Sequence, residues 1–234
     1  MSPAAPSPRP DQIAELTRGL ALPLGAIDDV FLEILAEGIS DAFDAIRHTS
    51  PATVATGSEA EVTALLVTRL NSMIDEEDGL WRRLVNSVTR GAESLNYDGS
   101  LLEKRPDVSI HLSDRTARFP LIAEAKLIDQ AAGERLYCAN GIRRFVEGEY
   151  AWGCREAFMI AYVRDGTKIA TKLTPYLARA ANAATYLVEA APTALLPAVA
   201  DVAASSHDRA FRYQHIAAPH NAPGTIMLWH LWLS

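Results

Sequence analysis

Apolar residues recur every three or four positions along the N-terminal part of the chain. This spacing predicts helices over 11–47, and Pro23 and Gly25 divide the interval into two. A further helix is predicted to begin after Ser58, because Glu61 lies three residues later and completes a capping box. The first third of the chain is therefore expected to be helical.

Alternation with a period of two replaces this pattern in the middle of the chain. Apolar and polar residues alternate over 107–112 and again over 118–128, with the turn residues 113–116 between them. We predict an antiparallel hairpin with one wholly apolar face. Glu124 and Lys126 lie on the opposite face of its second strand.

The C-terminal half predicts alternating helices and strands. We expect a helix over 140–152, a buried strand over 157–163, a long alanine-rich helix over 169–190, and late strands over 209–215 and 225–233. A strand, a helix and a strand in this order imply a parallel crossover beside the hairpin. The predicted fold class is α/β with a mixed β-sheet flanked by helices.

Composition narrows the class of protein. Hydrophobic residues make up 49% and charged residues 22% of the 234 residues, as in folded proteins. The net charge of −7 excludes a protein that coats nucleic acid through bulk positive charge. Cys138 and Cys154 are the only cysteines and lack zinc-ligand spacing, which favours a reducing cytoplasm. The proline-rich residues 1–10 are expected to be a disordered tail, and no segment is suited to a membrane.

The unusual charges are those of Glu124 and Lys126. Both lie in the middle of a predicted strand between apolar neighbours, where a charge is costly unless a partner or an ion compensates it. The chain has eighteen arginines but only four lysines, and yet this position is a lysine. A compact ammonium suits contact with a water or a phosphate oxygen.

The hairpin brings a third charge to this face. If the turn is centred near 115–116, Asp107 pairs with Glu124; if it is centred one residue earlier, Asp107 pairs with Ile122. In either register Asp107 shares a face with Glu124 and Lys126. Two carboxylates roughly 5–8 Å apart repel each other unless a cation lies between them. Hard oxygen ligands favour Mg²⁺ or Mn²⁺ over zinc, so we predict a metal site at Asp107 and Glu124.

These residues resemble a known family pattern. Pro106-Asp107, followed on the next strand by Glu124-Ala125-Lys126, resembles the PD-(D/E)xK nuclease superfamily, which has the restriction-endonuclease-like fold. In that family the aspartate and the first acidic residue of the triplet bind a divalent metal, and the lysine orients and polarises the attacking water.

The resemblance covers about residues 57–165 and implies the domain organisation. It implies an αβββαβ core within a nuclease-like domain over 51–234. The segment 11–50 would then be a helical N-terminal extension, after the tail 1–10.

A glutamate on the preceding helix often completes the site in this family. Glu59 and Glu61 are the two candidates. At 100° per residue, Glu59 lies on the side of the apolar stripe formed by Val62, Leu66 and Leu70, whereas Glu61 points away from it. We therefore choose Glu59 as the fourth catalytic candidate and assign Glu61 to the helix cap.

The resemblance implies a metal-dependent nuclease that acts on DNA more than RNA, as in bacterial restriction or phage defence. Arg143, Arg144 and Tyr150 follow the site and are candidates for contact with the nucleic-acid backbone, although a solvated helix face has the same composition. The acidic balance indicates that a homodimer or a larger complex supplies specificity. Two alternatives stay open, a catalytically silent structural subunit and a nucleotide-sensing module.

Overall fold

A computed structural model of the chain describes residues 10–76, 79–99, 105–130, 133–195 and 201–234. Of the predicted tail 1–10, only Pro10 lies within these residues, at the start of a helix. None of the helices in these ranges combines the length and the apolar character needed to cross a membrane.

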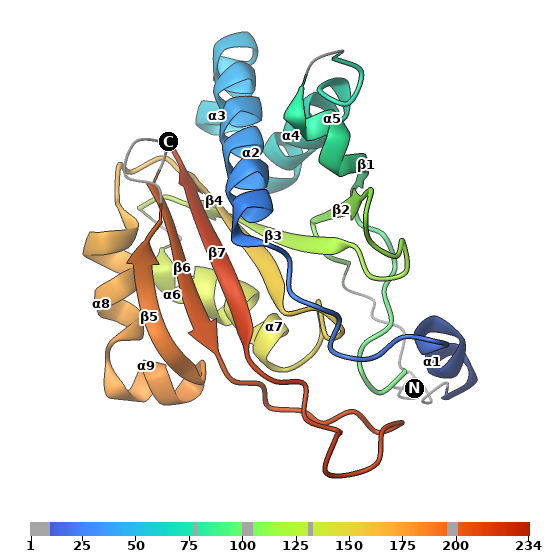
Figure 1. Cartoon of the computed structure of the whole chain (residues 1–234). Helices are drawn as coiled ribbons and strands as arrows, with labels where there is room; N and C mark the ends of the chain where they lie inside the picture. The colour runs from blue at the N-terminus through green and yellow to red at the C-terminus, as the bar shows by residue number, and fades with distance from the viewer. Residues whose placement is uncertain (1–9, 77–78, 100–104, 131–132, 196–200) are drawn as a thin grey trace, which may run out of the picture.

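A seven-stranded mixed sheet forms the centre of the molecule (Figure 1). Its spatial order is β1-β2-β3-β4-β7-β6-β5; β4 pairs in parallel with β3 and β7, and the other neighbours are antiparallel. The predicted α/β class with a mixed sheet is confirmed. The strands are β1 (Val85–Thr89), β2 (Val108–Leu112), β3 (Leu121–Ile128), β4 (Glu156–Val163), β5 (Val188–Ala194), β6 (Asp201–His207) and β7 (Ile226–Leu233).

Helices cover both faces of this sheet (Figure 1). Residues of α2, α4 and α5 share one buried apolar cluster with the sheet, and residues of α6, α7 and α8 share another with its opposite face. The helical segments are α1 (Pro10–Thr17), α2 (Asp29–Thr49), α3 (Pro51–Thr56), α4 (Glu59–Ser72), α5 (Leu80–Leu84), α6 (Glu134–Tyr137), the π-helical η1 (Cys138–Ile142), α7 (Arg143–Val146), the π-helical η2 (Ile169–Leu173), α8 (Thr174–Leu177) and α9 (Ala180–Thr185).

The long helix α2 is built into the core. Leu35 and Ile39 are fully buried in the cluster that also contains Trp229 of β7. Phe43 stacks on Tyr162 of β4, with ring centroids 5.9 Å apart. The helix that we expected in an N-terminal extension therefore packs directly against the sheet.

The central hairpin has the first of the two predicted registers. Val108 pairs with Ala123, and this is the outermost pair. The same register places Asp107 opposite Glu124, one residue beyond it. Val108, Ile110 and Ala123 are fully buried in the cluster that α2 and α4 cover. The predicted apolar face is thus confirmed along β2 and over Leu121, Ala123 and Ala125 of β3, whereas Phe119, expected on the same face, packs in the cluster on the opposite face of the sheet.

Three predicted elements differ from the structure. The helix expected over 140–152 spans α6, η1 and α7 and ends earlier, followed by Gly148 with a φ of +76°. The long helix expected over 169–190 is divided into the segments η2, α8 and α9, and it is wrong from Val188 onward, where β5 begins and pairs with β6. Val188 and Ala190 pair with His207 and Ser206 of β6, the next strand along the chain, and this pairing ends the helical region. The strand expected over 209–215 is also wrong: these residues form no strand, and β7 pairs instead with β6, which ends at His207.

Candidate active site

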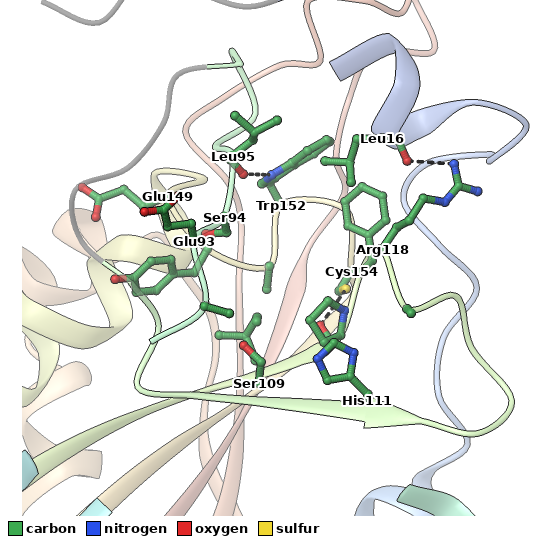
Figure 2. Close-up of a pocket in the computed structure, with 17 residues that line it drawn as sticks. Leu16, Glu93, Ser94, Leu95, Ser109, His111, Arg118, Glu149, Trp152 and Cys154 are labelled. Atoms are coloured by element: carbon green, nitrogen blue, oxygen red, sulfur yellow. Dashed lines mark hydrogen bonds between the residues drawn. The ribbon is translucent and has the colours of Figure 1, made fainter. Parts of the chain in front are cut away.

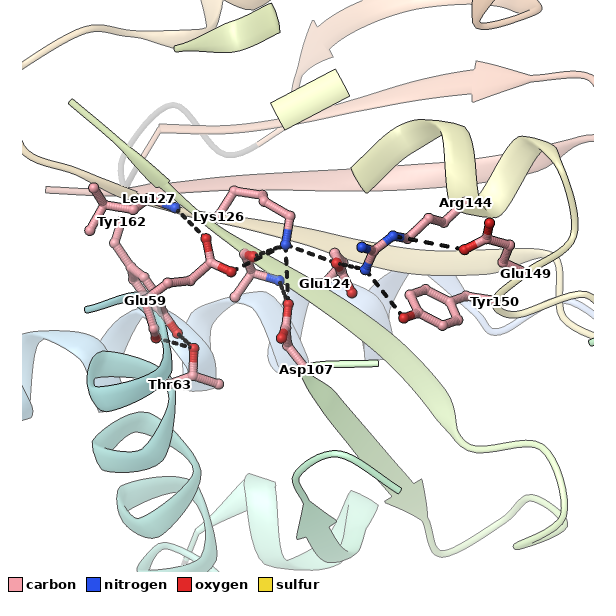
Figure 3. Close-up of polar contacts among 11 residues, drawn as sticks. Glu59, Thr63, Asp107, Glu124, Lys126, Leu127, Arg144, Glu149, Tyr150 and Tyr162 are labelled. Carbon is pink, nitrogen blue, oxygen red and sulfur yellow. Dashed lines mark hydrogen bonds and ion pairs between the residues drawn. The ribbon is translucent and has the colours of Figure 1, made fainter. Parts of the chain in front are cut away.

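The site lies where β3 continues past the end of β2. Beyond the pair Val108 and Ala123, two backbone N–H groups of β3 are bound by carboxylates (Figure 3). The N–H of Ala125 donates to Asp107 Oδ2 at 2.9 Å, and the N–H of Leu127 donates to Glu59 Oε2 at 3.0 Å. Two side chains thus replace the missing strand partner, and this fixes the position of both carboxylates.

Lys126 joins the carboxylates of this site. Its Nζ lies 2.8 Å from Glu124 Oε1, 3.3 Å from Glu59 Oε1 and 3.4 Å from Asp107 Oδ2. It also donates to the carbonyl oxygen of Ala125 at 2.5 Å. The structure therefore brings together all four residues that the sequence suggested as catalytic.

Glu124 is the most buried member of the group. Its side chain has no exposed surface, and Oε1 accepts hydrogen bonds from both Lys126 and Arg144. Its other oxygen, Oε2, has no hydrogen-bond partner among the described residues. Burial raises the pKa of Glu124 to about 7, although the positive charges of Lys126 and Arg144 oppose this shift.

Lys126 remains an ammonium at physiological pH. Burial lowers its pKa, but the negative charges of Glu124, Asp107 and Glu59 outweigh burial and raise the pKa above its ordinary value. With Glu124 ionised, the three carboxylates face two cations, Lys126 and Arg144. The cluster then carries a net charge of −1.

The start of α4 directs Glu59 toward the sheet. The Ser58 N–H donates to Glu61 Oε2 at 2.7 Å and the Glu61 N–H donates to Ser58 Oγ at 3.3 Å, which forms the predicted capping box. Arg164, after β4, donates to the carbonyls of Val54 and Gly57 and holds this turn on the sheet. Glu61 is therefore used in the cap and Glu59 faces the site. Arg164 was not among the predicted site residues; its place at the end of a buried strand was the only signal in the sequence.

The π-helical segment η1 lies directly over Glu124. A Cβ on Gly141 would come 2.3 Å from Met159 Cε and 3.9 Å from Glu124 Cγ, so that glycine permits the close approach. Insertion of a π turn into a helix is frequent at functional sites. The helix that contains η1 therefore closes one side of the site.

The three residues suggested for nucleic-acid contact have different positions. Arg144 Nη1 binds Glu124 and also donates to the hydroxyl of Tyr150 at 3.2 Å, so that both residues belong to the site (Figure 3). Arg143 lies outside the site and is exposed, with its Nε 3.9 Å from Glu147 Oε1. Sequence analysis did not predict the pairing of Arg144 with Glu124.

The donor atoms suit a hard divalent cation held by few protein ligands. In the described part of the chain, no group of three or more His, Cys, Asp or Glu is arranged as a metal cage. Mg²⁺ is usually bound by one or two carboxylates, with water and substrate phosphate as the other ligands. Asp107 and Glu124 provide such a pair. The Oε2 atom of Glu124, which has no hydrogen-bond partner among the described residues, can serve as a metal ligand. The residues therefore fit Mg²⁺ or Mn²⁺.

A second polar cluster lies in the core near β6 and β7. The Tyr137 hydroxyl is 2.9 Å from His230 Nδ1, and Ser205 Oγ is 2.7 Å from the Nε2 atoms of His230 and His207. Burial lowers the pKa of His230 to about 3 and that of His207 to about 4. These side chains are buried, and their hydrogen bonds connect β6 and β7 to Tyr137 of α6.

Comparison of the chain with protein-family models, curated proteins and solved structures gave no match. The interpretation of the site therefore depends on its own geometry.

Proposed function

We propose that this protein is a divalent-metal-dependent nuclease with a restriction-endonuclease-like core. The observation that carries the proposal is the convergence of Glu59, Asp107 and Glu124 on the ammonium of Lys126. Apart from the short helix α5 between α4 and β1, the order α4, β1, β2, β3, the α6–α7 helical segment and β4 is also the αβββαβ order that the sequence resemblance implies. Order and site together favour this family over an unrelated α/β domain.

Each residue has a role that follows from its contacts. Asp107 and Glu124 would hold Mg²⁺ or Mn²⁺, which when bound lowers the pKa of a water and neutralises charge on the phosphate. The ammonium of Lys126 would donate a hydrogen bond to the attacking water or to a phosphate oxygen as negative charge develops there. Glu59 keeps Lys126 in position, and Arg144 offers a second cation to the phosphate.

The test is cleavage of supercoiled plasmid and of circular single-stranded DNA with Mg²⁺ or Mn²⁺, with RNA as the competing substrate. We expect Asp107→Asn, Glu124→Gln and Lys126→Met each to reduce cleavage by at least 100-fold. Glu61→Gln is the matched control, because this nearby glutamate belongs to the helix cap.

Other outcomes identify the alternatives. Wild-type rates in any of the three site variants would remove that residue from the mechanism. Metal binding without cleavage of any substrate would favour a structural subunit. Stabilisation by a free nucleotide without cleavage would favour a nucleotide-sensing module.

A further inference from the structure

A cavity adjoins the candidate active site on the same face of the hairpin. Figure 2 shows the residues that line it. The cavity has a volume of about 300 Å³, within the range of small-ligand sites. Its walls come from the hairpin, the segment 92–95 and the segment 149–154, and most of its lining is apolar. Phe119, Tyr150 and Trp152 contribute aromatic rings to it.

Strand geometry fixes the distance between the cavity and the carboxylates. Ser109 and Ile122 line the cavity and pair with each other across β2 and β3. Ser109 is two residues from Asp107, and Ile122 is two residues from Glu124, in each case on the same strand face. Two residues span about 7 Å along a strand. This separation is comparable to the reach from a phosphate to the base of the same or the next nucleotide.

A shared residue links the two places. The ring of Tyr150 lines the cavity, while its hydroxyl accepts a hydrogen bond from Arg144, which binds Glu124. Glu149 also lines the cavity, with Oε2 3.9 Å from Arg144 Nε. A group seated in the cavity is therefore separated from the candidate metal ligands by only one side chain.

Two residues of the lining have a polar atom without a partner. Ser94 Oγ and Glu149 Oε2 are buried and have no hydrogen-bond partner among the described residues. The N–H of Trp152 donates to the Leu95 carbonyl at 2.6 Å, and its ring packs edge-on against Phe119 with ring centroids 5.0 Å apart. These two contacts hold the ring in place. The aromatic walls are thus fixed before any ligand binds.

We infer that this cavity receives an unpaired nucleobase of the strand whose phosphate lies at Lys126. A base has apolar faces for the aromatic walls and a polar edge for Ser94 and Glu149. A base stacked within a duplex cannot enter. The inference rests on the proposed function and specifies its substrate as single-stranded or locally opened nucleic acid.

The experiment measures binding in EDTA, so that cleavage does not interfere. The probe is a short single strand of DNA with one 2-aminopurine, compared with the same strand in a duplex. Its anisotropy reports binding, and its emission reports the environment of the base. We expect the single strand to bind at least tenfold more tightly than the duplex, with quenched emission from contact with the aromatic rings.

Two variants test the cavity itself. Ser94→Phe fills it, and Ala117→Trp obstructs it from an exposed position of its lining without changing the core. Both should remove the preference for the single strand. Ser94→Ala should weaken it only a few-fold. Ser72→Phe, at an exposed position of α4, should bind as the wild type does.

The outcomes separate this inference from the proposed function. Equal binding of strand and duplex, no binding of either, or unchanged binding by both cavity variants would overturn the inference, even if plasmid cleavage depends on Asp107. Single-strand binding that both cavity variants abolish would support it, even if no substrate is cleaved.

Discussion

Metal binding at Asp107 and Glu124 should depend strongly on pH, because only the ionised form of Glu124 binds a cation well. With a pKa of about 7, about one Glu124 in a hundred is ionised at pH 5, and about nine in ten at pH 8. The apparent affinity for Mn²⁺ should therefore fall about 90-fold from pH 8 to pH 5, which corresponds to about 2.7 kcal/mol.

Isothermal titration calorimetry with Mn²⁺ at pH 5, 6, 7 and 8 measures this dependence. Below pH 7 each bound ion should also release about one proton, which is detected as a dependence of the heat on the buffer. Glu124→Gln should bind weakly at every pH. Glu61→Gln should follow the wild-type curve. Equal Mn²⁺ affinities at pH 5 and pH 8 in the wild type would refute the assignment of Glu124 as a metal ligand.

When no metal is added, the raised pKa of Glu124 makes the free energy of unfolding fall as the pH rises, whereas the metal affinity increases with pH. The folded state holds the Glu124 proton more tightly than the unfolded state, whose pKa is near 4.5. The stabilisation is complete below pH 4.5 and is lost as the pH rises through about 7. The loss amounts to about 3 kcal/mol. Urea unfolding should show this decline in the wild type, and it should be absent in Glu124→Gln.

Three further predictions concern stability. Lys126→Met should lower the free energy of unfolding by about 3 kcal/mol at pH 8, and by less at pH 5, where Glu124 is neutral; urea unfolding at both pH values checks this. Gly141→Ala should cost about 1–3 kcal/mol, because its Cβ would meet Met159, whereas a Cβ on Gly133 has no atom of the described residues within 4 Å; equal melting temperatures for the two alanine variants would contradict this. Deletion of 11–50 should abolish cooperative unfolding, because it removes α2 from the core.

The site could be predicted because its residues obey local rules. Alternation with a period of two placed Asp107 and Glu124 on one face, and the hairpin had to bring them together. The angle between residues on a helix distinguished Glu59 from Glu61, and the capping box of the structure uses Glu61. Each of these inferences needed fewer than twenty residues of sequence.

What could not be predicted depends on contacts between elements. The helix expected over 169–190 ends before Val188, because β5 pairs with β6. Arg144 could be placed on a helix, but its pairing with Glu124 depends on how that helix crosses the sheet. The cavity likewise forms only when the segment 92–95 meets the segment 149–154.

The site forms because pairing between β2 and β3 stops at Val108, the first residue of β2. Pro106 has no N–H to donate, so regular pairing cannot continue beyond the residue that follows it. The edge of β3 is thereby left open at Ala125 and Leu127, whose N–H groups bind the carboxylates of Asp107 and Glu59. The same interruption leaves room for Lys126 to approach all three carboxylates. Ordinary strand pairing at this edge would occupy those N–H groups, so the end of pairing and the assembly of the site are one structural event.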